Sequence, residues 1–151
     1  MTEYAKKNVA IVTYNRIGRG QYENGLLEAK DCNIYIAQNG HRAKWAVDQD
    51  SAPTRSERAR IRSHAAKNAL NQLDLQDMDH IYLYVGTHGA EDVIKETRDI
   101  PAEKISYVLC DCNYYRKKEM IESIGNKDAE VIDSECGGRE TLERIVKKFA
   151  A

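Results

Sequence analysis

The chain has 151 residues, of which 31% are charged and 42% belong to the hydrophobic class, and its formal net charge is −1. This length fits a single domain over residues 1–151, and the composition is typical of a globular protein with a well-hydrated surface. A charge so close to zero gives no general attraction to nucleic acid or to anionic membranes, so neither is an expected partner. No apolar stretch approaches the roughly twenty residues of a membrane span, and the first residues lack the apolar core of a signal peptide, so we expect a cytoplasmic location.

The four cysteines are too few for a disulfide scaffold in a chain of this size, and their number is consistent with a reducing compartment. They are Cys32, Cys110, Cys112 and Cys136. His88, Cys112 and Cys136 are of the residue types that bind zinc. However, Cys110-x-Cys112 lacks the two intervening residues that usually separate a pair of zinc-binding cysteines. We therefore expect thiols, and no metal or other cofactor.

The first half of the chain predicts two short strands and a long helix. An apolar, β-branched run predicts a strand over residues 8–14, and a polar stretch with several glycines follows it. A second strand is expected over 33–37, with 41–47 as a candidate hairpin partner. A helix is expected over 54–73, because its apolar residues form a stripe at helical spacing that includes Ile61, Ala65, Ala69 and Leu73.

The second half alternates regularly between strands and helices. The expected strands cover 80–86, 105–110 and 129–133, and helical segments are expected around 91–97, 115–124 and 139–149. This order predicts an α/β fold with a mainly parallel sheet and helices on both faces. The first two of these strands are expected to be adjacent and parallel, because a short helical crossover joins two runs that are apolar on both faces.

A base and a thiol follow these two expected neighbours. One strand leads into Gly86-Thr87-His88-Gly89, and the next leads into Cys110-Asp111-Cys112. Parallel strands lie roughly 4.8 Å apart and end at the same edge of the sheet, which is where open α/β sheets place their ligands. A histidine beside a thiol at that edge is the minimal apparatus of a cysteine nucleophile, because the imidazole can take up the thiol proton.

This pair of strand ends resembles the caspase-like cysteine peptidases, including the bacterial clostripain-like and CHAT members. In that family one hydrophobic strand ends in His-Gly and the next ends in the nucleophilic cysteine. The resemblance covers about residues 78–115 and implies a caspase-like sandwich. It also implies that His88 is the base, that Cys112 is the nucleophile, and that the amides of Gly89 and Cys112 bind the oxyanion.

A third strand end suggests a binding function. The strand over 129–133 leads through Glu135 into Cys136-Gly137-Gly138 and then into a helix. A helix N-terminus lowers the pKa of a nearby thiol, and paired glycines let backbone amides converge on an anion. The alternative is that the two glycines form a tight strand-to-helix turn. Arg16 and Arg19, which follow the first strand, are candidates for binding an anionic group at the same sheet edge.

Two functions follow from these observations. The leading one is a cysteine hydrolase, a caspase-like peptidase or a degenerate relative, that uses a His88–Cys112 dyad. The alternative is a non-catalytic, Rossmann-like module that senses a nucleotide or another anion. A peptide or a small anionic ligand is the expected partner, and the sequence leaves the oligomeric state open.

Overall fold

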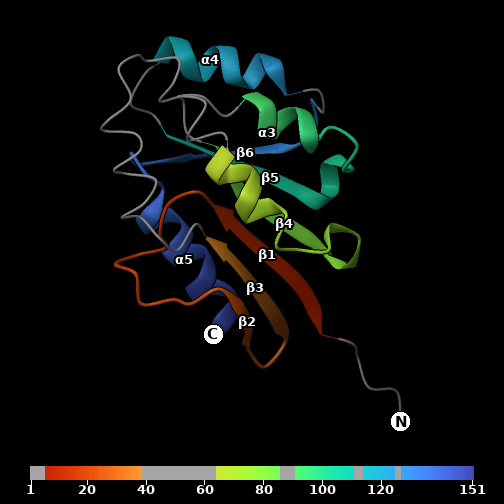
Figure 1. Ribbon diagram of the computed structural model, residues 1–151, viewed down its shortest axis with the longest axis vertical. Coiled ribbons are helices and arrows are strands. Elements are labelled where there is room, and N and C mark those ends of the chain that lie inside the picture. Colours follow the sequence, from red (N-terminus) through yellow and green to blue (C-terminus); the bar gives the residue numbers. More distant parts are fainter. Residues whose placement is uncertain (1–5, 39–63, 86–90, 111–113, 125–126) are drawn as a thin grey trace.

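The computed structural model describes residues 6–38, 64–85, 91–110, 114–124 and 127–151. Within these ranges six strands form one sheet in the order β2-β3-β1-β4-β5-β6 (Figure 1). All neighbouring strands are parallel except β2 and β3, so the expected mainly parallel sheet is confirmed. The strands are β1 Lys7–Thr13, β2 Gly25–Glu28, β3 Cys32–Gln38, β4 His80–Tyr84, β5 Ile105–Cys110 and β6 Glu130–Ser134.

The structure gives the bounds of three α-helices: α3 Glu91–Glu96, α4 Tyr114–Ser123 and α5 Arg139–Ala150. Each coincides with a helical segment expected from the sequence. The long helix expected over 54–73 is helical over 64–70, and residues 71–73 form a turn instead of its last residues. The rest of that expectation lies outside the described residues. No helix in the described ranges is both long enough and apolar enough to cross a membrane.

Helices cover both faces of the sheet. Residues alternate between faces along a strand, and directly paired residues of neighbouring strands share a face. Tyr82 faces α5, because its ring centroid lies 5.8 Å from that of Phe149. Leu83 therefore faces the other side, together with its β5 partner Tyr107, whose hydroxyl lies 2.7 Å from Thr97 Oγ1 just after α3. It follows that α3 and α5 lie on opposite faces.

The helix over 64–70 and α4 belong to the α3 face. Lys67 lies 3.5 Å from Glu96 at the end of α3, and α4 contacts α3 directly. In Figure 1, α3 and α4 lie together near β5 and β6, whereas α5 runs back beside β1 and β3. This confirms the expected fold class, an α/β sandwich.

The antiparallel partner of β3 differs from the expectation. Residues 41–47, the candidate hairpin partner, lie outside the described residues. The structure instead pairs β2 with β3, with Leu26 opposite Tyr35. This edge strand has only four residues, and Leu26 is 49% exposed, so its sequence has no run of alternating or continuous apolar residues to reveal it.

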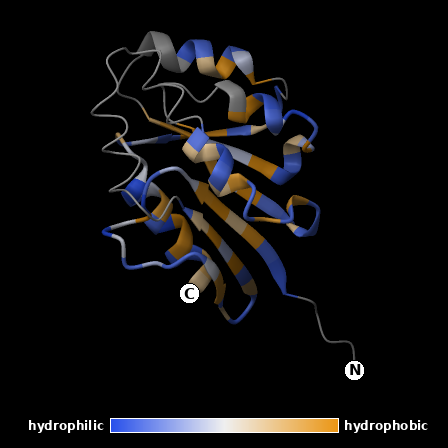
Figure 2. Ribbon diagram, in the orientation of Figure 1, coloured by the Kyte–Doolittle hydropathy of each residue, from blue (hydrophilic) through white to orange (hydrophobic). Residues whose placement is uncertain are grey.

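The core lies on the central strands. All six residues of β5 are buried, as are the last five of β1, and Figure 2 shows hydrophobic residues concentrated along the strands. Strands covered by helices on both faces bury both sets of side chains and so read as continuous apolar runs. From β1 the chain goes to β3 on one side and later to β4 on the other. Such a reversal of strand order favours a ligand site outside the carboxyl ends of these strands.

Candidate functional site

The carboxyl ends of β4 and β5 are neighbours, as the sequence predicts. Tyr84 pairs with Val108, and the Val85 N–H donates to the Val108 carbonyl at 3.1 Å. The two strands are parallel and adjacent, which confirms that prediction. The three residues assigned to the dyad and its oxyanion site, His88, Gly89 and Cys112, lie outside the described residues.

The turn between β6 and α5 lies against the end of β4. The Gly137 N–H donates to Tyr84 Oη at 3.0 Å, so this turn lies at the carboxyl edge of the sheet, as expected from its place after a parallel strand. Gly138 has a φ of 69°, in the left-handed region, and a Cβ at this position would lie 2.6 Å from the Tyr84 ring. Backbone conformation and close packing therefore both require glycine here.

Tyr84 is a neutral, buried phenol. Burial raises the pKa of Tyr84 far above its ordinary range, and nearby Tyr14 and Cys110 raise it further. The protonated phenol oxygen can still accept the Gly137 N–H while its own proton takes part in the side-chain hydrogen bond with Cys110. Tyr84 thus connects the end of β5 with the start of α5.

The first amides of α5 already have partners within the chain. Glu135 Oε1 accepts from the Glu140 N–H at 2.7 Å and from the Thr141 N–H at 3.1 Å, and Oε2 accepts from the Thr141 hydroxyl at 2.6 Å. The Gly138 N–H donates to the Glu135 carbonyl at 3.1 Å. An anion could reach these amides only by displacing Glu135. Anion binding by Gly137 and Gly138 stays a prediction, and the described geometry is that of a tight, capped turn.

Burial opposes the ionisation of Glu135, but the hydrogen bond from the Thr141 hydroxyl and those from backbone amides outweigh it and lower the pKa of the Glu135 carboxyl. An ionised carboxylate at a helix N-terminus also interacts favourably with the helix dipole. The N-cap position of α5 is Gly138, and the Glu135 side chain caps the helix by accepting from its first amides.

The loop after β1 is held in place from two sides. Gln38 Oε1 accepts from the Ile17 N–H at 3.0 Å, and its amide nitrogen donates to the Tyr22 carbonyl. On the other side, the Gly18 N–H donates to the Arg139 carbonyl at 3.0 Å, which joins the loop to the start of α5. The position of Arg19 is therefore fixed relative to α5.

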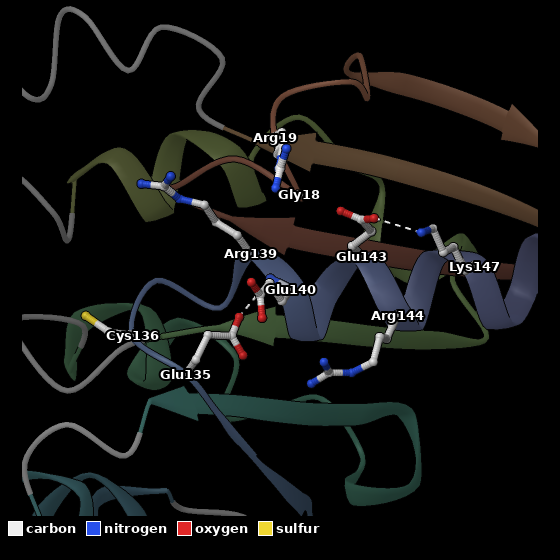
Figure 3. A pocket seen from close by; sticks show the side chains of 9 residues that line it. All are labelled: Gly18, Arg19, Glu135, Cys136, Arg139, Glu140, Glu143, Arg144 and Lys147. Atoms are coloured by element: carbon white, nitrogen blue, oxygen red, sulfur yellow. Dashed lines mark hydrogen bonds and ion pairs between the residues drawn. The ribbon is translucent and has the colours of Figure 1, made fainter.

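This loop and α5 enclose a pocket of about 730 Å³ (Figure 3). Such a volume lies within the range of about 300–1,000 Å³ that is common for small-molecule sites. The pocket extends from the turn after β6 along the first turns of α5. Its lining is strongly charged and contains one exposed thiol; the lining residues are Gly18, Arg19, Glu135, Cys136, Arg139, Glu140, Glu143, Arg144 and Lys147.

Two of the five residues predicted to bind a ligand line this pocket, namely Arg19 and Cys136. Gly137 and Gly138 form the turn beside it. Arg16 is not among the lining residues, because its side chain packs over Gly20, where a Cβ would lie 3.0 Å from one guanidinium nitrogen. The pocket therefore brings together only part of the predicted set.

The sequence analysis missed the pocket's contribution from α5. Arg139, Glu143 and Lys147 recur at intervals of four residues, which places them along one side of the helix. A charged stripe of this kind is typical of a solvated helix face, so spacing alone does not distinguish it from a pocket wall.

The described cysteines differ in accessibility. Cys32 and Cys110 are buried, whereas Cys136 is exposed at the pocket. In the described part of the chain, no group of three or more His, Cys, Asp and Glu side chains is arranged to hold a metal ion. No family model, curated protein or solved structure matches this chain.

Proposed function

We propose that this protein is a cysteine hydrolase in which Cys112 is the nucleophile and His88 is the general base. The observation that carries the proposal is the register of β4 and β5. Each paired β4 residue lies opposite the residue 24 positions later, as Ile81 lies opposite Ile105. His88 and Cys112 are also 24 positions apart in the sequence. The same offset, continued past the paired residues, would put the base and the thiol at the same level on neighbouring strand ends, and this supports the proposal.

The proposed chemistry follows from these two groups. His88 removes the thiol proton, and the Cys112 thiolate attacks the substrate carbonyl carbon to give a tetrahedral intermediate. The amides of Gly89 and Cys112 would stabilise its oxyanion. When the intermediate collapses, the carbon–nitrogen bond breaks, the leaving amine takes the proton from His88, and a thioester remains. Water activated by His88 then attacks the thioester, which releases the carboxylic acid and restores the thiol.

A peptide is the proposed substrate class. The resemblance of the two strand ends to the caspase-like peptidases supports it, and so does the sheet topology, which favours ligands at this edge. The buried thiols of Cys32 and Cys110 are poor candidates for the nucleophile, since a nucleophile must reach its substrate.

Brief treatment with limiting iodoacetamide, followed by peptide mass spectrometry, tests the dyad. We expect Cys112 to be labelled faster than Cys136, and His88→Ala to slow that labelling by about tenfold, because the imidazole no longer takes up the thiol proton. His64→Ala is the matched control, since His64 is an exposed histidine on the helix over 64–70. Equal labelling of Cys112 and Cys136, or no effect of His88→Ala, would contradict the proposal.

A stability measurement separates a nucleophile from a packed thiol. We expect Cys112→Ala and His88→Ala to abolish hydrolysis of a fluorogenic peptide library with little change in thermal stability. Cys112→Asp should also be tolerated if the side chain faces solvent, whereas a buried carboxylate would destabilise the fold strongly. A sharp loss of stability in Cys112→Asp, together with no labelling of Cys112, would rule out the hydrolase.

A further inference from the structure

The pocket beside α5 has charges that its own residues do not neutralise. Its lining includes four cationic and three acidic side chains. Two of the carboxylates already bind groups within the chain: Glu135 caps α5, and Glu143 lies 2.9 Å from Lys147 Nζ. Glu143 also forms a side-chain hydrogen bond with Gln21. The lining therefore has a net charge of +1, and the Glu143–Lys147 pair leaves the three arginines as its remaining cations.

Two arginines of the lining have no direct partner. Within the described residues, neither the Arg19 nor the Arg139 guanidinium makes an ion pair or a hydrogen bond, although the Arg19 charge acts on the nearby Glu143 carboxylate. Figure 3 shows both side chains on the same side of α5, one coming from the loop after β1 and the other from the first turn of the helix. Arg144, by contrast, extends to the other side and donates to Thr141 Oγ1 at 3.2 Å.

The backbone fixes the two arginines relative to each other. The hydrogen bond from Gly18 to the Arg139 carbonyl joins the residue before Arg19 to Arg139 itself. The Arg19 N–H donates to Gln21 Oε1 at 2.7 Å, which holds the turn that carries it. The two guanidinium groups therefore extend from backbone positions that are joined to each other, and an anion lying between them would be attracted by both.

A buried polar atom next to the same turn also lacks a partner. Asn15, at the end of β1, is 8% exposed, and its Oδ1 has no hydrogen-bond partner among the described residues. The Asn15 amide lies under Gly137, where a Cβ would be 3.3 Å from its nitrogen. Buried acceptors are normally satisfied, and an orphaned one is often completed by water or a ligand. Such an acceptor needs a hydrogen-bond donor, so water or a ligand hydroxyl would satisfy it, whereas an oxyanion would not.

We propose that the pocket beside α5 is a binding site for a small molecule that carries an oxyanion. Arg19 and Arg139 are the two residues that would bind the oxyanion. Planar guanidinium groups match the oxygens of carboxylate and phosphate in a bidentate fashion, which favours this class of ligand. The rest of the molecule would lie along α5 past Glu140, in a volume of about 730 Å³. The helix N-terminus is not part of the site, because Glu135 occupies it. This inference does not depend on the proposed hydrolase.

Binding of inorganic phosphate, measured by calorimetry at constant ionic strength with chloride as the balancing anion, provides the first test. We expect Arg19→Gln and Arg139→Gln each to weaken phosphate binding at least fivefold, and the double variant to lose it. Arg98→Gln is the control, because Arg98 is an exposed arginine outside the pocket. Equal phosphate affinity in the wild type and in the double variant would overturn the proposal.

Parallel titrations with succinate and with AMP distinguish a carboxylate ligand from a phosphate ester. Either is expected to bind more tightly than inorganic phosphate, since the pocket extends beyond the two arginines. If neither binds more tightly, the pocket attracts simple ions only and the proposal fails.

The Cys136 thiol reports on the same site. We expect a bound anion to slow its reaction with iodoacetamide in the wild type and not in the double variant Arg19→Gln, Arg139→Gln, since Cys136 and both arginines line the pocket. Repeating the titrations in Cys112→Ala separates the two proposals. Unchanged anion binding in that variant is expected even if peptide hydrolysis is never observed, whereas loss of binding would show that the site is not independent.

Discussion

The ring of Tyr84 occupies the space that a side chain at position 138 would need, because a Cβ on Gly138 would lie 2.6 Å from it. The hydroxyl of the same residue accepts the Gly137 N–H at 3.0 Å. One tyrosine at the end of β4 therefore fixes the turn that begins α5. The strand that leads toward His88 and the helix that lines the pocket are held together by this contact.

Replacement of Gly138 by alanine tests this contact. We expect Gly138→Ala to lower the free energy of unfolding by about 2–4 kcal/mol, because a left-handed backbone and a clash with a packed ring add their costs. Urea unfolding is the measurement. Gly25→Ala serves as the control, because Gly25 also has a positive φ but a Cβ there meets nothing within 4 Å. A loss in Gly138→Ala no larger than the roughly 1–2 kcal/mol that a left-handed alanine costs by itself would show that the ring contact contributes nothing.

Removal of the α5 cap should produce a loss of stability that depends on pH. The folded pKa of Glu135 is lowered, so its carboxylate stabilises the fold above the unfolded pKa of about 4.3, and this stability disappears as the pH falls through the folded pKa. We expect Glu135→Gln to cost about 1 kcal/mol at pH 7 and progressively less as the pH falls through the folded pKa of Glu135. Glu140→Gln, at an exposed neighbour, is the control, and equal losses of stability in the two variants at pH 7 would contradict this assignment.

His80 lies at the opposite edge of the sheet, and its environment predicts a second pH dependence of the protein's stability. Its Nδ1 donates to the Glu103 carbonyl at 3.1 Å, and its Nε2 lies 2.7 Å from the buried Ser106 hydroxyl. Burial lowers the pKa of His80, the Glu103 hydrogen bond raises it, Lys7 lowers it and Glu130 raises it, and the balance is a lowered value.

Because the folded pKa of His80 is lowered, the unfolded state takes up a proton first as the pH falls. We therefore expect stability to decline as the pH drops below about 6.5, and to level off once the folded state is protonated as well. His80→Gln should remove this decline in thermal unfolding experiments. In NMR titrations, Glu130→Gln should lower the His80 pKa further, since the carboxylate favours the charged imidazole. A rise in that pKa would mean that the Glu130 charge does not act on His80.

The side-chain hydrogen bonds of Gln38 to the loop after β1 should strengthen ligand binding. Gln38→Leu removes the acceptor for the Ile17 N–H and the donor to the Tyr22 carbonyl. We expect anion binding to weaken severalfold in this variant although both arginines remain, because the loop then positions Arg19 less well. Calorimetry with phosphate checks this, with Gln72→Leu at an exposed turn as the control. Wild-type affinity in Gln38→Leu would show that the loop needs no such anchor.

The elements that were predicted well are those whose burial is visible in the sequence. The bounds of β5 agree with the expectation because all six of its residues are buried, which gives an unbroken apolar run. The edge strand β2 was not predicted, because Leu26 is exposed to solvent and the strand is defined by its pairing with β3. Arg19 and Cys136 could be named because each closely follows a strand. The part played by Arg139 depends on its contact with Gly18, and no local pattern connects residues so far apart in the chain.

The contact between Gly18 and Arg139 also has a consequence for synthesis of the chain. Gly18 leaves the ribosome before Arg139, whose partner carbonyl emerges only with α5. Until then, the nascent loop after β1 lacks the hydrogen bond that joins it to α5, and the pocket lacks the side that α5 forms. A ribosome-bound chain that stops before α5 should therefore be unable to hold an anion, whatever the state of its strands.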